Sequence, residues 1–140
     1  MIRSSLAVAL VALPGIAAAG NVQFSAQPGG QIAFVMPSGN IGCTYTPAGG
    51  APHYTPADGG PELSCDRIEP VYLRFVLGRA GPAVRIENVG DPGCCAAENA
   101  FAYGARWEFD GYYCESEKTG LTCLRGANGF FISRKETTVW

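Results

Sequence analysis

The sequence predicts an all-β fold, a small barrel or sandwich that is built from meanders and stapled by disulfides. After Gly20, Gly and Pro interrupt nearly every window, and no stretch of a dozen residues keeps the apolar spacing of an amphipathic helix. Short runs that alternate apolar and polar residues are frequent instead, as in half-buried strands. The six cysteines are an even number, which favours a set of structural disulfides.

The beginning of the chain reads as a signal peptide over residues 1–19. Arg3 gives this stretch a positive charge, residues 6–13 form a short apolar run, and the alanines at 17–19 offer a cleavage site. The run is too short to span a membrane, and no later stretch approaches the roughly 20 apolar residues that a span needs. We therefore expect a secreted or periplasmic protein with a single domain over residues 20–140.

The charge of the expected mature chain is mild. It carries nine Lys and Arg residues against twelve Asp and Glu residues, a net charge of −3. Such a chain offers no basic patch for nucleic acid or anionic lipid, so we expect no nucleic-acid partner. We also expect the protein to be a monomer. The Cys and His spacings of a zinc site are missing and His53 is the sole histidine, so no metal and no cofactor are expected.

Turn residues order the first half of the domain. Pro28-Gly29-Gly30 and residues 37–40 are expected turns, and residues 47–61, where eight of fifteen residues are Gly or Pro, are an expected flexible surface loop. Residues 71–77 are nearly all apolar and are predicted to be the most buried strand. The other strands expected in this half are residues 22–27, 31–36, 41–45, 63–68 and 84–88.

The C-terminal part has the clearest pattern. Asp110-Gly111 is a strong signal for a two-residue hairpin turn. The aromatic residues before this turn alternate with charged residues and are assigned to the core; they are Phe101, Tyr103, Trp107 and Phe109. Strands over 112–116, 121–125 and 130–134, separated by turns at 117–120 and 126–129, complete a meander.

This register predicts two disulfides. If residues 117–120 are the loop, Cys114 lies opposite Cys123, and facing residues on neighbouring strands are within bridging reach. By the same reasoning Cys43 and Cys65 lie on the two strands that flank the 47–61 loop. The remaining adjacent cysteines leave two alternatives: Cys94 and Cys95 bond each other through a strained geometry, or one of the two pairs is wrong and each reaches elsewhere.

Several short motifs carry a resemblance to a known family. They are Pro37-Ser38-Gly39-Asn40-Ile41-Gly42-Cys43, Cys65-Asp66, Tyr103-Gly104, Cys114, Gly120-Leu121-Thr122-Cys123 and Gly129-Phe130-Phe131-Ile132-Ser133-Arg134. From about Phe34 to Arg134 the chain resembles an uncharacterised family of small secreted bacterial disulfide proteins with no assigned activity. The resemblance implies export, disulfides and a compact β fold, and it implies no enzyme. Family members carry a cysteine in the region that corresponds to residues 67–85, whereas this chain has Cys94 instead.

Few residues offer catalytic chemistry. His53 lies in the Gly/Pro loop, which is a poor mount for a base that must be held rigidly against a nucleophile. Glu108 and Asp110 share a strand face, and paired carboxylates serve glycoside hydrolysis, but charges on an exposed strand face are usually a solvated surface. No catalytic residue is therefore assigned.

The candidate ligand contacts are Tyr112, Tyr113, Ser133 and Arg134. One of the two tyrosines after the hairpin turn is expected to face outwards, where its ring could meet a sugar or a protein. The hydroxyl of Ser133 and the guanidinium of Arg134 could hold a carboxylate or phosphate. Alternatively, Arg134 pairs internally with Asp66.

The function expected from the sequence is that of an exported, non-catalytic binding or inhibitor-like domain whose partner is an envelope glycan or protein. The first alternative is a small secreted hydrolase that uses carboxylates such as Glu108 and Asp110, which would then line a concave pocket. The second alternative is a purely structural envelope protein.

Overall fold

The computed structural model describes residues 7–11 and 20–140, and in this part of the chain it contains strands and turns but no helix. Most of the expected signal peptide, including Arg3 and the alanines at 17–19, lies outside the described residues. Over the described ranges, no helix is long and apolar enough to cross a membrane.

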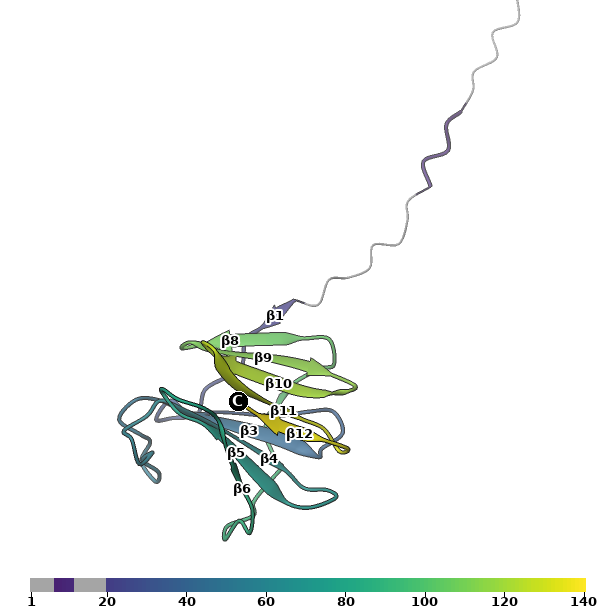
Figure 1. Cartoon of the computed structure of the whole chain (residues 1–140). Coiled ribbons are helices and arrows are strands. Elements are labelled where there is room, and N and C mark those ends of the chain that lie inside the picture. The colour runs from purple at the N-terminus through teal and green to yellow at the C-terminus, as the bar shows by residue number, and fades with distance from the viewer. Residues whose placement is uncertain (1–6, 12–19) are drawn as a thin grey trace, which may run out of the picture.

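Two six-stranded sheets make up the described domain, and Figure 1 shows them as two layers. The first sheet has the order β1 (Asn21–Val22), β8 (Arg106–Phe109), β9 (Tyr112–Glu117), β10 (Gly120–Arg125), β11 (Asn128–Ile132) and β12 (Thr137–Val139). The second has the order β6 (Val84–Ile86), β5 (Leu73–Leu77), β4 (Glu62–Arg67), β3 (Ile41–Thr46), β2 (Ile32–Val35) and β7 (Asn99–Ala100). Strands β2–β6 and β8–β12 are antiparallel meanders, whereas β1 and β7 add parallel edge pairings. The all-β, meander-built prediction is confirmed, and the two sheets form a sandwich and not a closed barrel.

One hydrophobic core fills the space between the two sheets. Side chains alternate along each strand, so every second residue points inwards. Aromatic rings join the layers: the ring centroids of Phe34 and Trp107 are 5.1 Å apart, and those of Phe75 and Phe130 are 5.7 Å apart. Such contacts explain why these four rings are almost completely buried.

Two disulfides cross-link facing positions within the core. Cys114 pairs with Cys123 across β9 and β10, and Cys43 pairs with Cys65 across β3 and β4. All four cysteines are buried. Both predicted pairs are therefore confirmed, together with the registers from which they were derived. The structure also pairs Cys94 with Cys95, which is the first of the two alternatives that the sequence left open.

The structure also contains the predicted turns. At Asp110 and Gly111 φ is +48° and +82°, the backbone of a two-residue hairpin turn with both central residues left-handed. The loop at 117–120 is tighter than expected, because Glu117 and Gly120 already pair and only two residues lie between them.

Burial differs from prediction at β5. The most buried strand is β4, and not residues 71–77, because β5 buries only alternate residues and Val71 is 61% exposed. The outward side chains of β5 line a groove that is described below. The charged residue Arg74, inside this apolar run, marks that outward face.

The strand expected over residues 101–109 is interrupted. A turn at residues 102–105 separates β7 from β8, so the alternation does not run through it. Phe101 and Trp107 are buried as predicted, whereas Tyr103 and Phe109 are 37% and 44% exposed, and their assignment to the core is wrong.

Three short strands also differ from expectation. The expected strand over residues 22–27 reduces to β1, although Phe24 still packs against the core. Strand β6 ends at Ile86, so Asn88 is not in it. Strand β12 was not expected, and it pairs with β11.

The buried disulfides should stabilise the domain, and the one that closes the longer loop should contribute more. The Cys43–Cys65 bond spans 22 residues and the Cys114–Cys123 bond spans nine. We expect C43A/C65A to lower the free energy of unfolding by about 3.4 kcal/mol and C114A/C123A by about 2.6 kcal/mol in a chain-entropy account, with lost packing added to both. Urea unfolding followed by tryptophan fluorescence checks this. C94A/C95A is the control, because the bond between adjacent residues closes no long loop. A larger loss of unfolding free energy in this variant than in the other two would contradict the chain-entropy account.

Candidate functional site

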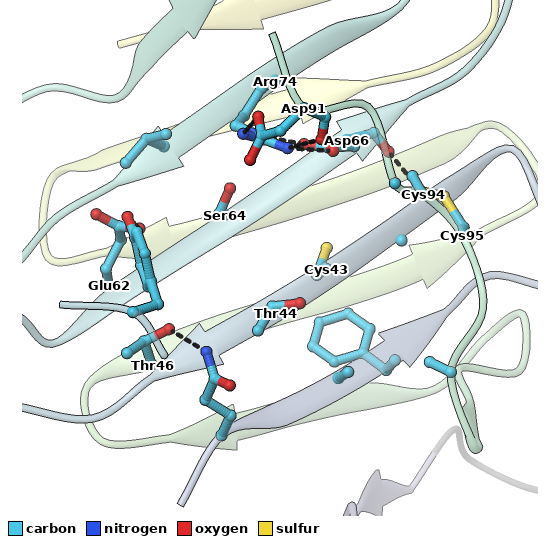
Figure 2. A pocket seen from close by; sticks show the side chains of 18 of the residues that line it. Cys43, Thr44, Thr46, Glu62, Ser64, Asp66, Arg74, Asp91, Cys94 and Cys95 are labelled. Atoms are coloured by element: carbon cyan, nitrogen blue, oxygen red, sulfur yellow. Dashed lines mark hydrogen bonds and ion pairs between the residues drawn. A yellow bond between two sulfur atoms is a disulfide. The ribbon is translucent and has the colours of Figure 1, made fainter. Parts of the chain in front are cut away.

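The outward face of the second sheet carries a groove of about 370 Å³. Strands β3, β4 and β5 form its floor, and Figure 2 shows the side chains that line it. Two connecting segments wall it: the 47–61 loop contributes Tyr54, and the segment after β6 contributes residues 91 and 93–97. We call this feature the outer groove.

The floor of the outer groove is polar because the register of β3 and β4 turns their polar residues outwards. Thr46 lies opposite Glu62, Thr44 opposite Ser64, and Gly42 opposite Asp66. The apolar residues between them point into the core. Three carboxylates, those of Glu62, Asp66 and Asp91, line the groove together with one guanidinium, that of Arg74, so its charge is net negative.

At one end of the groove, Tyr54 reaches down from the loop. Its hydroxyl donates a hydrogen bond of 2.6 Å to Glu62 Oε1. Burial, and then this hydrogen bond, raise the pKa of Tyr54 to about 12. Backbone bonds of 2.7 and 3.2 Å between Ala51 and Tyr54 fold the loop at this point. Glu62 itself is only 8% exposed.

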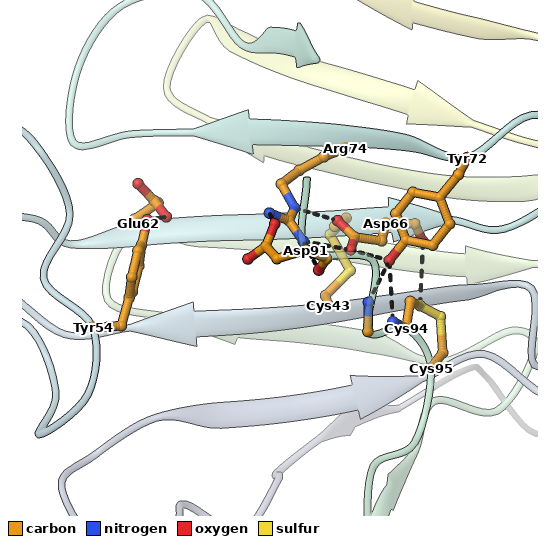
Figure 3. Close-up of polar contacts among 11 residues, drawn as sticks. Cys43, Tyr54, Glu62, Asp66, Tyr72, Arg74, Asp91, Cys94 and Cys95 are labelled. Atoms are coloured by element: carbon orange, nitrogen blue, oxygen red, sulfur yellow. Dashed lines mark hydrogen bonds and ion pairs between the residues drawn. A yellow bond between two sulfur atoms is a disulfide. The ribbon is translucent and has the colours of Figure 1, made fainter. Parts of the chain in front are cut away.

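At the other end, a network centres on Asp66 (Figure 3). Arg74 donates to both carboxylate oxygens of Asp66, at 2.8 and 2.9 Å, and Tyr72 donates to Oδ2 at 2.5 Å. Arg74 also donates to Asp91 at 2.8 Å. The hydrogen bond to Asp66 is the main cause that raises the pKa of Arg74, and burial is the main cause that raises the pKa of Tyr72. All these groups are therefore already engaged.

The same network holds the segment that carries Cys94 and Cys95 against the sheet. The backbone N–H groups of Gly93 and Cys94 donate to the Tyr72 hydroxyl at 3.2 and 3.0 Å. A Cβ atom on Gly42 would lie 2.9 Å from Cys95 Cβ and 3.1 Å from Cys94 Sγ. Glycine at 42 is thus what allows the cysteine pair to lie directly on β3.

The two tyrosines after the hairpin turn divide as expected, one inwards and one outwards. Tyr112 is fully buried, and its hydroxyl lies 2.9 to 3.1 Å from the carbonyl oxygens of Pro61, Leu77 and Gly78. Burial raises its pKa to about 12. Tyr113 is half-buried on the opposite face, and its hydroxyl donates to Glu115.

Ser133 and Arg134 lie in a different region, at the turn between β11 and β12. The Ser133 hydroxyl accepts from the backbone N–H groups of Lys135 and Glu136, at 3.2 and 3.0 Å. Arg134 pairs with Glu69 at 2.6 Å, and not with Asp66. Both residues line a second groove of about 650 Å³, which contains neither Tyr112 nor Tyr113. The four candidate ligand contacts are therefore not gathered in one site.

The residues weighed for catalysis are not gathered either. Glu108 is exposed, and Asp110 accepts a 2.5 Å hydrogen bond from the Tyr45 hydroxyl. Neither lines the outer groove, the second groove, or a third groove beside Arg67 and Arg85. His53 is exposed in its loop. Over residues 7–11 and 20–140, no three His, Cys, Asp or Glu side chains are grouped so that they could hold a metal ion.

Sequence reasoning missed the outer groove. Its charged residues are spread over Glu62, Asp66, Arg74 and Asp91, in three separate segments, and only their outward registers bring them together. The one available signal was Arg74, a charged residue in an apolar run. That signal would have justified the prediction that an aspartate on the neighbouring strand pairs with Arg74.

The tyrosine environments predict a loss of stability at alkaline pH. The folded pKa values of Tyr54 and Tyr112, about 12, lie above the ordinary value of 10.0. Because the folded state holds these protons more tightly, their contribution is complete below pH 10 and is lost as pH rises through 12. We expect the free energy of unfolding to fall over this range, and to fall less steeply in Tyr54→Phe. Urea unfolding at a series of pH values measures it, and an equally steep fall in both proteins would disprove the role of Tyr54.

Comparison with known proteins gives no further guide. No family model matches the chain, and searches of curated proteins and of solved structures found no match. The family resemblance drawn from the short motifs stays a prediction, and the proposal for this protein depends on the chemistry of the outer groove.

Proposed function

We propose that this protein is an exported, non-catalytic binding domain that binds an amine-bearing glycan of the cell envelope in the outer groove. Export is supported by the signal-peptide pattern of residues 1–19 and by the disulfides, which are compatible with an oxidising compartment such as a periplasm or the outside of the cell.

One observation carries the proposal: Glu62 is a buried carboxylate without a cation. It is 8% exposed, lines the groove, and makes no ion pair in the described part of the chain. Buried charges in proteins are normally paired. The one guanidinium of the groove belongs to Arg74, which already binds Asp66 and Asp91. A ligand ammonium group therefore supplies the missing partner.

The neighbouring floor suits hydroxyl groups. Thr44 and Ser64 face each other in the middle of the groove, and neither side chain makes a hydrogen bond to another described residue. A hydroxyl both donates and accepts, so this pair matches the hydroxyls of a sugar ring. Tyr54 adds an aromatic ring at the end where Glu62 lies.

The geometry favours binding over catalysis. Asp66 accepts three hydrogen bonds and Glu62 accepts one from Tyr54, so both carboxylates are held in place as acceptors. Glycoside hydrolysis needs one carboxyl group free to give up a proton and a second free to attack or to activate water. The hydrolase alternative with Glu108 and Asp110 finds no shared groove to support it.

The matched probes for this proposal are the glucosamine tetramer and the N-acetylglucosamine tetramer, which differ in the charge of the nitrogen. At mildly acidic pH we expect the amine form to bind, and Glu62→Gln to weaken it about tenfold or more, because a hydrogen bond between two charged groups is lost. Calorimetric titration measures the affinity. Glu108→Gln, an exposed carboxylate outside the groove, is the control and should leave binding unchanged.

The outcomes separate the alternatives. Equal binding of the acetylated tetramer contradicts the role given to the ammonium group. Binding of a lysine-rich peptide but of neither tetramer would make the partner a protein. No binding of any of these probes would overturn the proposal and favour a purely structural envelope role.

A further inference from the structure

Arg67 is a second buried charge, on the inner face of the sandwich. It ends β4 and is only 5% exposed. Its Nη1 donates to the Ser133 carbonyl oxygen at 3.0 Å and its Nη2 to the Val71 carbonyl oxygen at 3.2 Å. In the described part of the chain, its Nε is the one buried side-chain nitrogen or oxygen without a hydrogen-bond partner.

No anion neutralises this guanidinium. Arg67 makes no ion pair among the described residues. Carbonyl oxygens satisfy hydrogen-bond donors, but they leave the net charge in place, and a buried charge without a counter-charge is costly. Burial, and then the neighbouring cation Arg85, lower the pKa of Arg67. The buried cation Arg67 also lines the same groove as a second cation, Arg85.

Both arginines line a groove of about 500 Å³, which we call the arginine groove. Its other lining residues are Val71, Tyr72, Leu73, Glu87, Asn88, Val89 and Pro92. Glu87 is the one carboxylate in the lining, and it pairs with Arg85 at 2.6 Å through side chains that are 60% and 44% exposed. Arg85 also donates to Thr137 at 3.3 Å. After this pairing the groove keeps one positive charge, which is that of Arg67.

We propose that the arginine groove binds a small oxyanion, a phosphate or carboxylate group, between Arg67 and Arg85. A guanidinium has five N–H donors, and Arg67 uses two of them on carbonyl oxygens. The oxyanion accepts from Arg67, whose Nε–H has no partner in the described part of the chain, and from Arg85. The side-chain amide of Asn88 adds a neutral donor at the same groove. This site is separate from the outer groove, and it does not depend on the function proposed for that groove.

Inorganic phosphate, acetate and chloride at equal ionic strength are the probes. Nitrogen-15 NMR titration should show saturable shifts at Tyr72, Arg85 and Asn88 with phosphate or acetate, and not with chloride. Phosphate but not acetate would identify the phosphate group as the ligand, and the reverse would identify the carboxylate. Identical responses to all three salts would overturn the proposal, because they would report ionic strength alone.

Variants test the two arginines separately. Arg85→Met removes an exposed side chain, so it should leave the fold intact and weaken the oxyanion about tenfold, the value of a lost charged hydrogen bond. Arg106→Met, an exposed arginine of the other sheet, is the matched control and should not change affinity. Arg67→Met should abolish binding. If Arg67→Met does not fold, Arg85→Met decides, and unchanged affinity in that variant would disprove the site.

Discussion

The register of β3 against β4 is the constraint on which the rest of the structure depends. Cys43 lies opposite Cys65, and their disulfide locks that pairing from inside the core. A slip of one residue would exchange the two faces of a strand. The disulfide therefore fixes which residues face each side: Thr44 and Ser64 line the outer groove, whereas Tyr45 and Leu63 pack in the core.

The outer groove exists because two connecting segments fold back over the sheet. A bare sheet face would be flat, and walls must come from loops. Tyr54 ties the first segment to Glu62, while Asp91 and the backbone of Gly93 tie the second to Arg74 and Tyr72. Each of these hydrogen bonds uses a polar side chain that the strand register turns outwards. The register therefore determines both the fold of the sheet and the position of the groove walls.

The sequence predicted those parts of the fold that local chemistry determines. Asp110-Gly111, the loop at 117–120 and the cysteine positions were independent signals, and they agreed on the registers that the structure has. It could not predict the outer groove, because a groove depends on how separate segments are placed over one another. Nor could it show that Arg134 pairs with Glu69 and not with Asp66, because the partner is chosen by the distance between loops.

Strand β4 explains why both proposed sites arise in this molecule. It is a central strand that is covered on both faces, so its charged residues are buried whichever way they point. Glu62 points outwards near its beginning and Arg67 points inwards at its end. They are five positions apart along the strand, about 17 Å at roughly 3.4 Å per residue, and they lie on opposite faces. They cannot neutralise each other, so each buried charge needs a partner of its own, one cation and one anion.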